Sequence, residues 1–462
     1  MDRTPESSPG PLPPLVAASY PRLRLEWVRR PVQFLERNRE RYGPIFAARF
    51  GPRQYAVFVS DVEAVREVVA RDGDDVRMGA ANGIFRAGLG SSSILVLDGD
   101  EHLRHRRLMA PGFNRRHVAS FARLIESVTI ERLEALPRGV PVPLQPEFER
   151  IAFDAAMAIV FGIEDGPRAD QIRTLFPKMM DLTDRPSTLL PALRRELGGL
   201  STWGRLMKVV RKLDDLLRAE IRDRRAEPAL EDREDLLSLL CSAKQADGTP
   251  MTETELRDEM LTLLMAGQET TSAAMAWSFE RLVHNPRALA RLEREVVEPG
   301  PPGEEEYLDA VIRETLRLRP PVPVMARKAR VPIRLGPYEI PAGWVIMPCV
   351  YLLHREPTLY PRPDEFLPER FLVAPPPRGA WMPFGGGVRH CLGTHLAELE
   401  MRIVLRTILS RVELRPGGEV EAIRRRRFAF SPVGDASVVL TDRRRRLTRL
   451  SPQESAKGAP VA

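Results

Sequence analysis

A cysteine at the end of a glycine-rich stretch is the residue of this chain with the clearest potential for chemistry. Cys391 follows FGGGVRH at 384–390, and a helical pattern from Leu392 to Ile408 begins directly after it. We therefore expect the cysteine at a helix N-terminus, where the helix dipole and free backbone N–H groups favour thiolate over thiol. The glycines let the backbone approach a flat, bulky group, and Arg389 adds a fixed positive charge.

The same residues have two plainer interpretations. A buried structural cysteine beside a turn is the common fate of a lone cysteine. A zinc site could use Cys391, His390 and His395, but the sequence offers no fourth ligand at the usual spacing. The specific glycine-rich pattern favours a reactive thiolate over both.

A second candidate lies in the middle of a long predicted helix. Thr252 and Glu255 have the spacing of a capping box, and apolar residues then recur until Asn285-Pro286, where Asn can cap the next helix and Pro can take its first position. The run predicts one helix of about 30 residues. Because its middle is apolar on both faces, we expect it to run through the interior.

The centre of that helix breaks the apolar pattern, with AGQETT at 266–271. A glycine, an acid and two threonines are poor choices for a buried helix, and such rules are usually broken where function requires it. The alternative is a threonine bonded back to the preceding turn beside a solvated glutamate.

The cysteine segment resembles the haem-binding loop of the cytochrome P-450 superfamily. The pattern of that loop, FxxGxRxCxG, is matched at Phe384, Gly387, Arg389, Cys391 and Gly393. The resemblance implies that Cys391 is the proximal ligand of a haem iron and that Phe384 shields its sulfur. Gly393 would let the following helix pass close to the porphyrin. Thiolate ligation in this family pushes electron density that favours O–O cleavage.

Further motifs of the family follow in the same order. ETLR at 314–317 matches ExxR, and RPP at 319–321 and PERF at 368–371 come after it. Spacing of three puts Glu314 and Arg317 on one helical face, although an ordinary surface ion pair would look the same. By resemblance, Arg370 joins them in a buried network that braces the haem loop.

AGQETT resembles the oxygen-activating segment of the family. Thr270 would then hydrogen-bond the bound oxygen or its water, and Glu269 would help to deliver protons. The chemistry consumes two protons, so a hydroxyl and a carboxylate close to the oxygen have a clear purpose. We therefore predict Thr270 and Glu269 as the catalytic residues.

The propionates of haem require cations, and the resemblance implies which residues supply them. His102 and Arg106 are four residues apart, match the HxxxR helix of the family and share a helical face. Arg327 stands where the family usually has another propionate arginine, and Arg389 would be the fourth partner. Arginine suits carboxylates through its bidentate fork. A solvated basic helix is the alternative.

The fold class follows from periodicity and from the resemblance. Most of the chain has helical periodicity, IFAARFGPRQYAVFV at 45–59 predicts a β-hairpin, and 338–353 predicts short strands around a turn. The protein is thus expected to be mainly α with a small β portion. By resemblance it has the cytochrome P-450 fold, a single large domain that encloses haem between the long helix and the cysteine-loop helix. We predict this domain over 21–450, between a flexible arm at 1–20 and a flexible tail at 451–462.

Composition limits the compartment and the partners. The 462 residues include three scattered cysteines, which argues against a disulfide framework and fits a reducing cytoplasm. No apolar run is long enough for a signal peptide or a membrane span. The net charge is +7, but the arginine runs at 424–427 and 443–446 lack interleaved aromatics, so we expect solvated strand ends and a basic terminus, not a nucleic-acid site.

These observations predict a monomeric monooxygenase that carries haem b and takes electrons from NAD(P)H through ferredoxin reductase and a ferredoxin. No GxGxxG follows a strand, so no nicotinamide or flavin domain is expected in the chain. Arg107, Arg115 and Arg116 would dock the acidic donor. A haem-thiolate peroxygenase or isomerase and a haem gas sensor remain as alternatives.

The resemblance also implies which segments face the substrate. They are 79–96, 165–210, Val322 to Met325, and the turn at 432–434. Their apolar residues, such as Ile84, Phe85, Ile94, Leu95 and Val324, predict a lipophilic substrate of the terpenoid, fatty-acid or steroid kind. Core packing would give the same composition.

Overall fold

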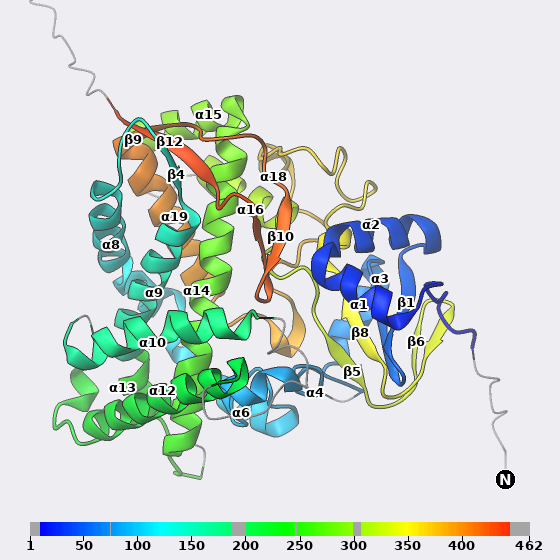
Figure 1. The fold of residues 1–462 in the computed structure, drawn as a ribbon, viewed down its shortest axis with the longest axis horizontal. Helices are drawn as coiled ribbons and strands as arrows, with labels where there is room; N and C mark the ends of the chain where they lie inside the picture. Colours follow the sequence, from blue (N-terminus) through cyan, green and yellow to red (C-terminus); the bar gives the residue numbers. More distant parts are fainter. Residues whose placement is uncertain are drawn as a thin grey trace, which may run out of the picture.

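A helical part and a smaller part built on a mixed sheet lie side by side, with helix α14 near the middle of the view (Figure 1). The computed structural model describes residues 10–73, 75–163, 165–185, 200–244, 247–298 and 306–443. The expected tail at 451–462, the start of the arm and most of the second arginine run lie outside these ranges. The main helices are α6 (Gly99–Met109), α8 (Ala122–Glu134), α9 (Gln145–Phe161), α10 (Pro167–Thr183), α12 (Thr202–Arg225), α14 (Glu253–Val283), α15 (Pro286–Val297), α16 (Glu306–Leu318) and α19 (Thr394–Arg411).

Shorter elements connect these helices and form the sheets. The short helices are α1 (Tyr20–Arg29), α2 (Pro31–Tyr42), α3 (Val62–Ala70), α4 (Met78–Ala81), α5 (Arg86–Leu89), α7 (Arg115–Ser120), α13 (Leu236–Ser242), α17 (Val350–Leu353) and α18 (Arg370–Val373). The strands are β1 (Ile45–Gly51), β2 (Gln54–Val59), β3 (Val76–Arg77), β4 (Pro141–Pro143), β5 (Arg327–Ala329), β6 (Ile333–Leu335), β7 (Tyr338–Ile340), β8 (Val345–Pro348), β9 (Val412–Pro416), β10 (Ile423–Arg426), β11 (Ala429–Pro432) and β12 (Ser437–Asp442). The mainly α fold class with a small β portion is confirmed.

Helix α14 forms as its sequence predicts. Thr252 and Glu255 make the reciprocal capping box, and the helix runs without a break to Val283. Pro286 begins α15 as expected, but the Asn285 side chain donates to the Arg281 carbonyl and does not cap the next helix. The interior course of α14 is confirmed, because nearly all its residues from Leu256 onward are buried.

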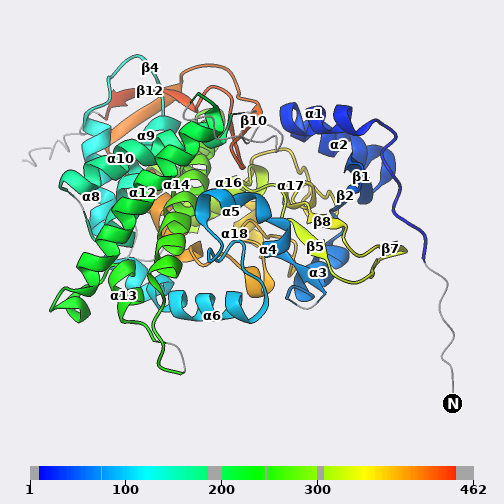
Figure 2. The ribbon, with the colours of Figure 1, turned by 60° about the horizontal axis from the view of Figure 1, so that its bottom comes forward.

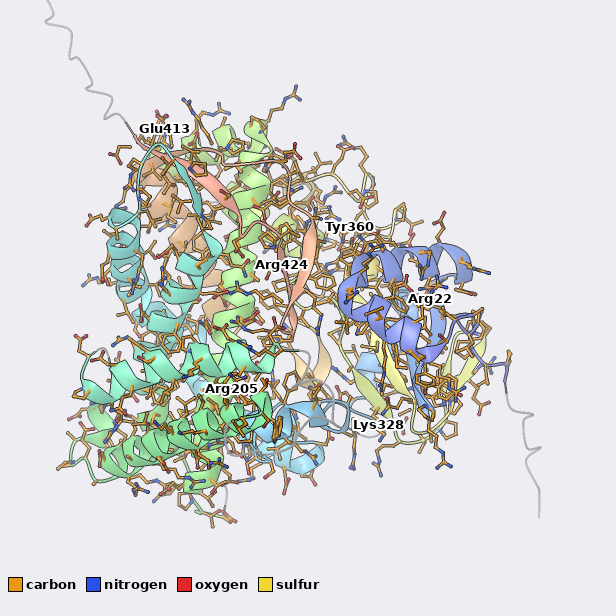
Figure 3. All side chains as sticks on the ribbon, viewed as in Figure 1. Arg22, Arg205, Lys328, Tyr360, Glu413 and Arg424 are labelled. Carbon is orange, nitrogen blue, oxygen red and sulfur yellow. The ribbon has the colours of Figure 1, made fainter. Side chains whose placement is uncertain are left out.

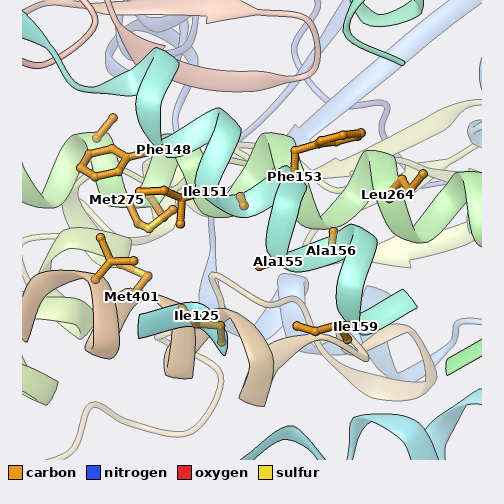
Figure 4. Packing of buried hydrophobic residues seen from close by; sticks show 14 of the residues in the cluster. Ile125, Phe148, Ile151, Phe153, Ala155, Ala156, Ile159, Leu264, Met275 and Met401 are labelled. Carbon is orange, nitrogen blue, oxygen red and sulfur yellow. The ribbon is translucent and has the colours of Figure 1, made fainter. Parts of the chain in front are cut away.

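The core around α14 is formed mainly by α9, which crosses it. Phe148, Ile151 and Ala155 of α9 are buried, and Met275 of α14 lies on the same side of that helix as Met401 of α19 (Figure 4). The ring centroids of Phe148 and Phe279 are 5.1 Å apart. Burial of these side chains is favourable by about 25 cal/mol per Å² of apolar surface, which holds the long helix in place through tertiary packing.

The mixed sheet has the order β1-β2-β8-β5-β3. The hairpin predicted at 45–59 is confirmed, with Ile45 opposite Val59. The strands predicted within 338–353 form, but β7 pairs with β6 while β8 runs parallel to β2. The expectation of strand structure to residue 353 is wrong, because 350–353 form helix α17. A short apolar run does not distinguish a strand from a buried helical turn.

Residues 10–19 of the expected arm lie against the sheet. Val16 donates to the Ala47 carbonyl at 2.8 Å, and Ala47 donates to the Pro14 carbonyl at 2.8 Å. Gly10 donates to the Glu339 carboxylate. The segment thus satisfies backbone groups on the edge strand β1, which would otherwise face water unpaired. No helix among the described residues is long and apolar enough to cross a membrane.

Candidate active site

One cavity brings the cysteine loop and the centre of α14 together. Its volume is about 320 Å³, and its lining is mostly apolar. Figure 2 shows α4, α5 and α6 lying between the helical part and the sheet; residues of α4 and α6 reach this cavity. The predicted site residues that line it are His102, Arg106, Thr270, Arg327, Phe384, Arg389, Cys391 and Gly393; Glu269 and Gly387 are not among its lining residues.

Cys391 is presented by a loop whose backbone is closed on itself. The Cys391 N–H donates to the Phe384 carbonyl at 2.9 Å, and α19 begins at Thr394 with Gly393 as its N-cap. The expected place at a helix N-terminus is thereby confirmed. Gly387 has φ +62°, and a Cβ there would lie 2.7 Å from the Val69 carbonyl oxygen, so only glycine fits.

The pKa of Cys391 is shifted in the direction opposite to the sequence-based expectation. Burial raises the pKa of the Cys391 thiol, and the N–H of Gly393, the Thr394 side chain and Arg106 counteract the rise only in part. Cys391 is nevertheless exposed, and it lines the cavity. The helix N-terminus alone therefore does not lower this pKa below its ordinary value, whereas coordination to a metal ion deprotonates a thiol outright.

The other two cysteines have no such surroundings. Cys349 is fully buried, and burial raises its pKa to about 12. Cys241 packs against the main hydrophobic core. Neither lines the cavity. Among the described residues, no group of three or more His, Cys, Asp or Glu could hold a metal ion.

The ExxR pair forms the buried network that the sequence predicts. Glu314 and Arg317 are both 0% exposed and bond through two contacts, Nε to Oε2 at 2.7 Å and Nη2 to Oε1 at 2.9 Å. Arg370 Nε donates to the same carboxylate at 3.1 Å. Every oxygen and the guanidinium are thus satisfied, as a buried ion pair requires.

This network reaches the cysteine loop through a histidine. Arg317 Nη1 donates to the His354 carbonyl at 2.8 Å, and the Met382 N–H donates to His354 Nε2 at 2.9 Å. Burial lowers the pKa of His354 to about 3, so the ring is neutral and Nε2 can accept. Gly385, next to Phe384, donates to the Met382 carbonyl. The ion pair therefore braces the start of the cysteine loop.

One stripe of α14 faces the cavity. Between 256 and 283, the positions that are not fully buried are Leu263, Ala266, Gly267 and Thr270, and all four line the cavity. Their spacing places them on one helical face. A Cβ added at Gly267 would meet nothing within 4 Å, so the cavity extends to the helix backbone there.

Thr270 lies on this stripe with its hydroxyl proton already engaged. Its Oγ1 donates to the Ala266 carbonyl at 2.7 Å, which is the back-bonding that the sequence left open as the alternative. The oxygen lone pairs stay available to accept a hydrogen bond from the cavity side. Thr271, which the sequence analysis did not single out, also lines the cavity.

Glu269 points away from the stripe and is not solvated. It is 1% exposed and forms a close ion pair with Arg427, which follows β10. Burial raises the pKa of Glu269, and Arg427 counteracts the rise. Its second oxygen, Oε1, is buried without a hydrogen bond among the described residues.

The first arginine run therefore does not consist of solvated strand ends. Arg424, labelled on hairpin β10–β11 in Figure 3, pairs with Asp435, and Arg426 pairs with Glu149 at 2.5 Å. Arg427 also contacts Asp181 at 3.0 Å and is 7% exposed in its side chain. The expectation was wrong because the hairpin folds against α14, where carboxylates of α9, α10 and α14 meet it.

The residues expected to bind the propionates line the cavity, but they differ in charge and in whether an acid already pairs with them. Arg106 lines the cavity and has no ion-pair partner among the described residues. His102 is 3% exposed, and its pKa is lowered to about 3 by burial first and by Arg389 and Arg106 next. His102 is thus a neutral donor and not a cation.

Arg327 and Arg389 already have acidic partners that the sequence analysis missed. Arg327 Nε lies 2.5 Å from Asp72 Oδ2. Arg389 Nη2 donates to Asp98 Oδ1 and to the Leu97 carbonyl, each at 2.7 Å. Local sequence gave no signal for Asp72 or Asp98, because each meets its arginine from a distant segment.

Glu400 is a further lining residue that sequence reasoning missed. It lies on α19, is 5% exposed and forms no hydrogen bond or ion pair with the residues that the structure describes. Burial raises its pKa to about 8. The available signal was its spacing: Leu396, Ala397, Glu400 and Met401 share the helical face that lines the cavity, so an acid interrupts an apolar face.

The predicted substrate-facing segments are only partly brought together. Ile94, Leu95, Val322 and Met325 line the cavity, as expected. The remaining expectations do not match the lining: Ile84 is 52% exposed, Val433 is 51% exposed, Phe85 packs against Phe428, and Val324 packs in the core beneath the sheet. No described residue of 165–210 lines the cavity, and 186–199 lie outside the described ranges.

The arrangement suits one kind of group. A thiol sits at the wall of an apolar cavity, a helix with an exposed glycine lines it as well, and arginines gather along one side. A flat, apolar metal complex with a thiolate ligand and acidic side chains would satisfy all three features, and the arginines would otherwise be buried with too few acids.

Comparison with known proteins finds relatives over nearly the whole chain. The sequence profile described as Cytochrome P450 matches residues 9–435. Cytochrome P450 135B1 of Mycobacterium tuberculosis is 37% identical over 389 residues, which cover 84% of this chain and 82% of that protein. Cytochrome P450 138 of the same species is 35% identical over 441 residues, with coverage of 94% and 98%. The solved structure of a retinoic acid-bound cyanobacterial CYP120A1 has a TM-score of 0.82 and 25% identity, and the match covers 94% of this chain and 100% of that chain.

Proposed function

Because the chain belongs to the cytochrome P450 family, whose members are haem-dependent monooxygenases, we propose that it inserts one atom of dioxygen into a lipophilic small molecule and takes electrons from a separate ferredoxin-type protein. Cys391 carries this proposal, since it is the cysteine that faces the apolar cavity between the long helix and the arginines. Haem b bound there supplies oxygen activation, which thiolate ligation promotes.

The cysteine loop supports the proposed ligand role. Phe384 lines the cavity beside Cys391, and its ring centroid is 6.1 Å from that of Trp381, which holds it in place. A Cβ at Gly393 would lie 3.9 Å from the Cys391 sulfur, an ordinary van der Waals contact, so the backbone at Gly393 passes close to the ligand. Gly387 lets the loop pass Val69 closely. We assign shielding to Phe384 and close approach to Gly393.

The cation side supports binding of the two propionates. Arg106 has no competing acid among the described residues and is therefore the strongest proposed partner. Arg327 and Arg389 present further N–H groups beside their carboxylate contacts, and His102 can donate one N–H from a neutral ring. The forked guanidinium groups of arginine match carboxylates well, which favours binding of the propionates beside these arginines.

Proton delivery is proposed to use Thr270 and Glu269 in different ways. Thr270 can accept a hydrogen bond from a water or an acid in the cavity while Ala266 holds its own proton. Glu269 must leave Arg427 to reach the cavity, because α14 directs its side chain off the lining stripe. Its raised pKa makes protonation easier near neutral pH, which suits an acid that passes protons inward.

The lining supports a lipophilic substrate. Ile94, Leu95, Val322 and Met325 come from the predicted substrate segments, and Ile159 and Val160 of α9 add apolar surface. The structurally similar CYP120A1 holds retinoic acid, a lipophilic molecule. Burying apolar substrate surface against such walls is favourable without a specific polar contact. A terpenoid, a fatty acid or a steroid-like molecule fits this description.

Electron supply is proposed to come through an acidic ferredoxin that receives electrons from NAD(P)H by way of a ferredoxin reductase. Arg107, Arg115 and Arg116 are exposed, and none has an ion-pair partner among the described residues. Helix α7, which carries Arg115 and Arg116, packs against α19, the helix that follows Cys391. A positive surface near the ligand helix steers an acidic partner toward it.

A carbon monoxide spectrum tests the proposal. The reduced protein with carbon monoxide should show the red-shifted Soret band of thiolate ligation. Cys391→Ala should lose this band, while Cys241→Ala and Cys349→Ala, the matched controls, should keep it. Loss of the band in a control, or its survival in Cys391→Ala, would remove Cys391 as the ligand.

A peroxygenase is the second candidate, and one observation favours it. Glu269 is held off the cavity by Arg427, so an enzyme that used hydrogen peroxide would need no rearrangement of this pair. Product formed with hydrogen peroxide alone, and none with dioxygen, ferredoxin, ferredoxin reductase and NADPH, would establish the peroxygenase. The reverse result would establish the monooxygenase.

A further inference from the structure

Two carboxylates contact the cavity-lining arginines without lining the cavity themselves, and they have no part in the reaction proposed above. Asp72 follows α3, and its side chain is 0% exposed. Asp98 precedes α6, and its side chain is 13% exposed. Neither lines the cavity, yet both contact arginines that do. A buried carboxylate is costly unless it is paired, so its position needs a reason.

Asp72 lies between two of the arginines. Its Oδ2 is 2.5 Å from Arg327 Nε, and its Oδ1 is 3.7 Å from Arg389 Nε. Both guanidinium groups are buried, with side chains 1% and 3% exposed. One carboxylate thus bridges two cations that come from different segments of the chain.

Without that bridge the two arginines would repel each other in a medium that screens poorly. Burial lowers the pKa of Arg327 and of Arg389, and Asp72 is the largest influence that opposes the change in both. Arginine does not give up its proton in proteins, so the cost remains as repulsion. Asp72 therefore keeps both guanidinium groups at the cavity wall.

Asp98 has a second duty that distinguishes it from Asp72. Its carboxylate accepts from the N–H groups of Gly79 and Ala80, each at 2.8 Å, as well as from Arg389. These bonds join the two ends of segment 79–98, which carries the cavity-lining residues Ile94 and Leu95. Substitution of Asp98 would disturb this segment, whereas Asp72 has no side-chain contact with it.

The net positive charge beside the cavity is therefore smaller than the three arginines alone would give. Arg106, Arg327 and Arg389 line the cavity, and Asp72 and Asp98 contact two of them. His102 contributes no charge, since its pKa is lowered to about 3. With Asp72 and Asp98 ionised, one net positive charge faces the cavity. Burial raises the pKa of Asp72, and Arg327 and Arg389 counteract the rise and favour its ionised form.

We infer that Asp72 is a positioning residue for haem, holding Arg327 and Arg389 together while offsetting their charge, and that it lowers the reduction potential of the bound iron. The inference rests on the proposed function, because it requires haem in this cavity. A negative charge close to the iron stabilises the more positive oxidised state. Its removal leaves the arginines in excess and favours the reduced state.

The test compares the reduction potentials of four substrate-free holoproteins by spectroelectrochemical titration. Asp72→Asn keeps the size of the side chain and removes its charge, and it should shift the potential to a more positive value than wild type. Asp72→Glu keeps the charge and should stay near wild type. Asp75→Asn is the matched control: it removes one charge nearby, but Asp75 is 36% exposed and pairs with Arg71, so water and salt screen it.

Each outcome decides the inference. A positive shift in Asp72→Asn alone upholds it, and a shift no larger than that of Asp75→Asn overturns it. If Asp72→Asn binds no haem, normal haem uptake and a normal potential in Asp72→Glu would uphold the need for the carboxylate. If Asp72→Glu also failed to bind haem, Asp72 would have only a packing role. A wild-type protein that showed no thiolate band would defeat the proposed function instead.

Discussion

Glu314 of α16 and Glu269 of α14 are both buried against arginine, but their pairs differ in completeness. Glu314 binds Arg317 through both oxygens and also accepts from Arg370 and from the Leu367 N–H. Glu269 binds Arg427 through one oxygen and leaves Oε1 without a hydrogen bond among the described residues. The first pair can only hold the fold, because opening it would strand several groups. The second can open at the cost of fewer bonds.

The difference matches what each pair must do. The Glu314 network fixes His354 and Met382, and through them the loop that presents Cys391. The Glu269 pair ties α14 to hairpin β10–β11, next to the threonine that faces the cavity. A permanent ion pair and one that can open can thus be formed by the same two residue types. The number of surrounding hydrogen-bond donors decides which one results.

Breaking the complete pair should have the largest effect on stability. Arg317→Ala leaves a buried carboxylate uncompensated, which should cost about 3–5 kcal/mol. We expect little haem-loaded protein and a strong loss in thermal unfolding temperature. Arg313→Ala on the same helix is the control, since Arg313 is exposed. If Arg317→Ala were as stable and as fully loaded as Arg313→Ala, the bracing role would be refuted.

Glu400 extends the comparison to an acid that has no hydrogen-bond or ion-pair partner among the described residues. Its pKa is about 8 in the folded chain against the ordinary value of 4.5, so the folded state binds more protons between these values. Stability should then fall as pH rises across that window, by about 1.4 kcal/mol per pH unit.

Glu400→Gln should remove this slope and stabilise the protein most at pH 8. The measurement is denaturant unfolding at pH 5, 6.5 and 8. Burial also raises the pKa of Glu398 on the same helix, so Glu398→Gln shows how much of the slope belongs to that second acid. An identical pH slope in Glu400→Gln and wild type would show that Glu400 is ionised in the folded protein.

Removing Arg427 tests the breakable pair, with a smaller and pH-dependent cost. Because burial raises the pKa of Glu269, protonation can relieve the stranded carboxylate, and the loss should stay below about 3 kcal/mol. The folded state would hold the proton above the ordinary pKa of 4.5, so Arg427→Ala should destabilise more at pH 8 than at pH 5.5.

Thermal unfolding of Arg427→Ala at both pH values gives this comparison. Arg425→Ala is the control, because Arg425 forms no ion pair with the described residues. A cost that is the same at both pH values would mean that Glu269 stays ionised without Arg427.

Thr270→Ala should have the smallest effect on stability, under about 1 kcal/mol, and a large effect on chemistry. Haem content and substrate binding should be unchanged, because the Ala266 carbonyl is the hydroxyl's hydrogen-bond partner within the described part of the chain. Product should fall by about 100-fold or more, the scale of general acid–base catalysis, while reduced oxygen leaves as hydrogen peroxide.

Peroxide formed per electron pair is the quantity to compare among wild type, Thr270→Ala and Thr270→Ser. The serine variant keeps the hydroxyl and should remain close to wild type. Equal ratios in all three would leave Thr270 as a packing residue.

Much of the fold could be predicted because its signals are local. The capping box at Thr252, the hairpin turn after Gly51 and the three-residue spacing of Glu314 and Arg317 each depend on neighbours within a few positions. The place of Cys391 before a helix follows from the same kind of pattern. Such signals are read directly from the order of residues.

The errors concern groups whose partners lie far along the chain. Glu269 and Arg427 are 158 positions apart. The expectation of solvated arginines at 424–427 therefore proved wrong, and the alternative of a solvated Glu269 does not hold either. With 70 basic and 63 acidic side chains, the sequence does not say which of them meet. The pairing of Arg389 with Asp98 has the same origin. The back-bonding of Thr270 is a local contact within one helical turn, and it was one of the two alternatives that the sequence left open.

The sequence by itself determined the long helix, the cysteine loop, the ExxR brace and, through them, the family. Only the tertiary structure decided the pKa shifts and the charge pairing: a neutral His102, a Glu400 with a pKa of about 8, a raised pKa at Cys391, and an Asp72 between two arginines. The physical reason is that helix and turn formation depend on nearby backbone and side chains. Ionisation depends on burial and on charges that the fold brings together from remote segments.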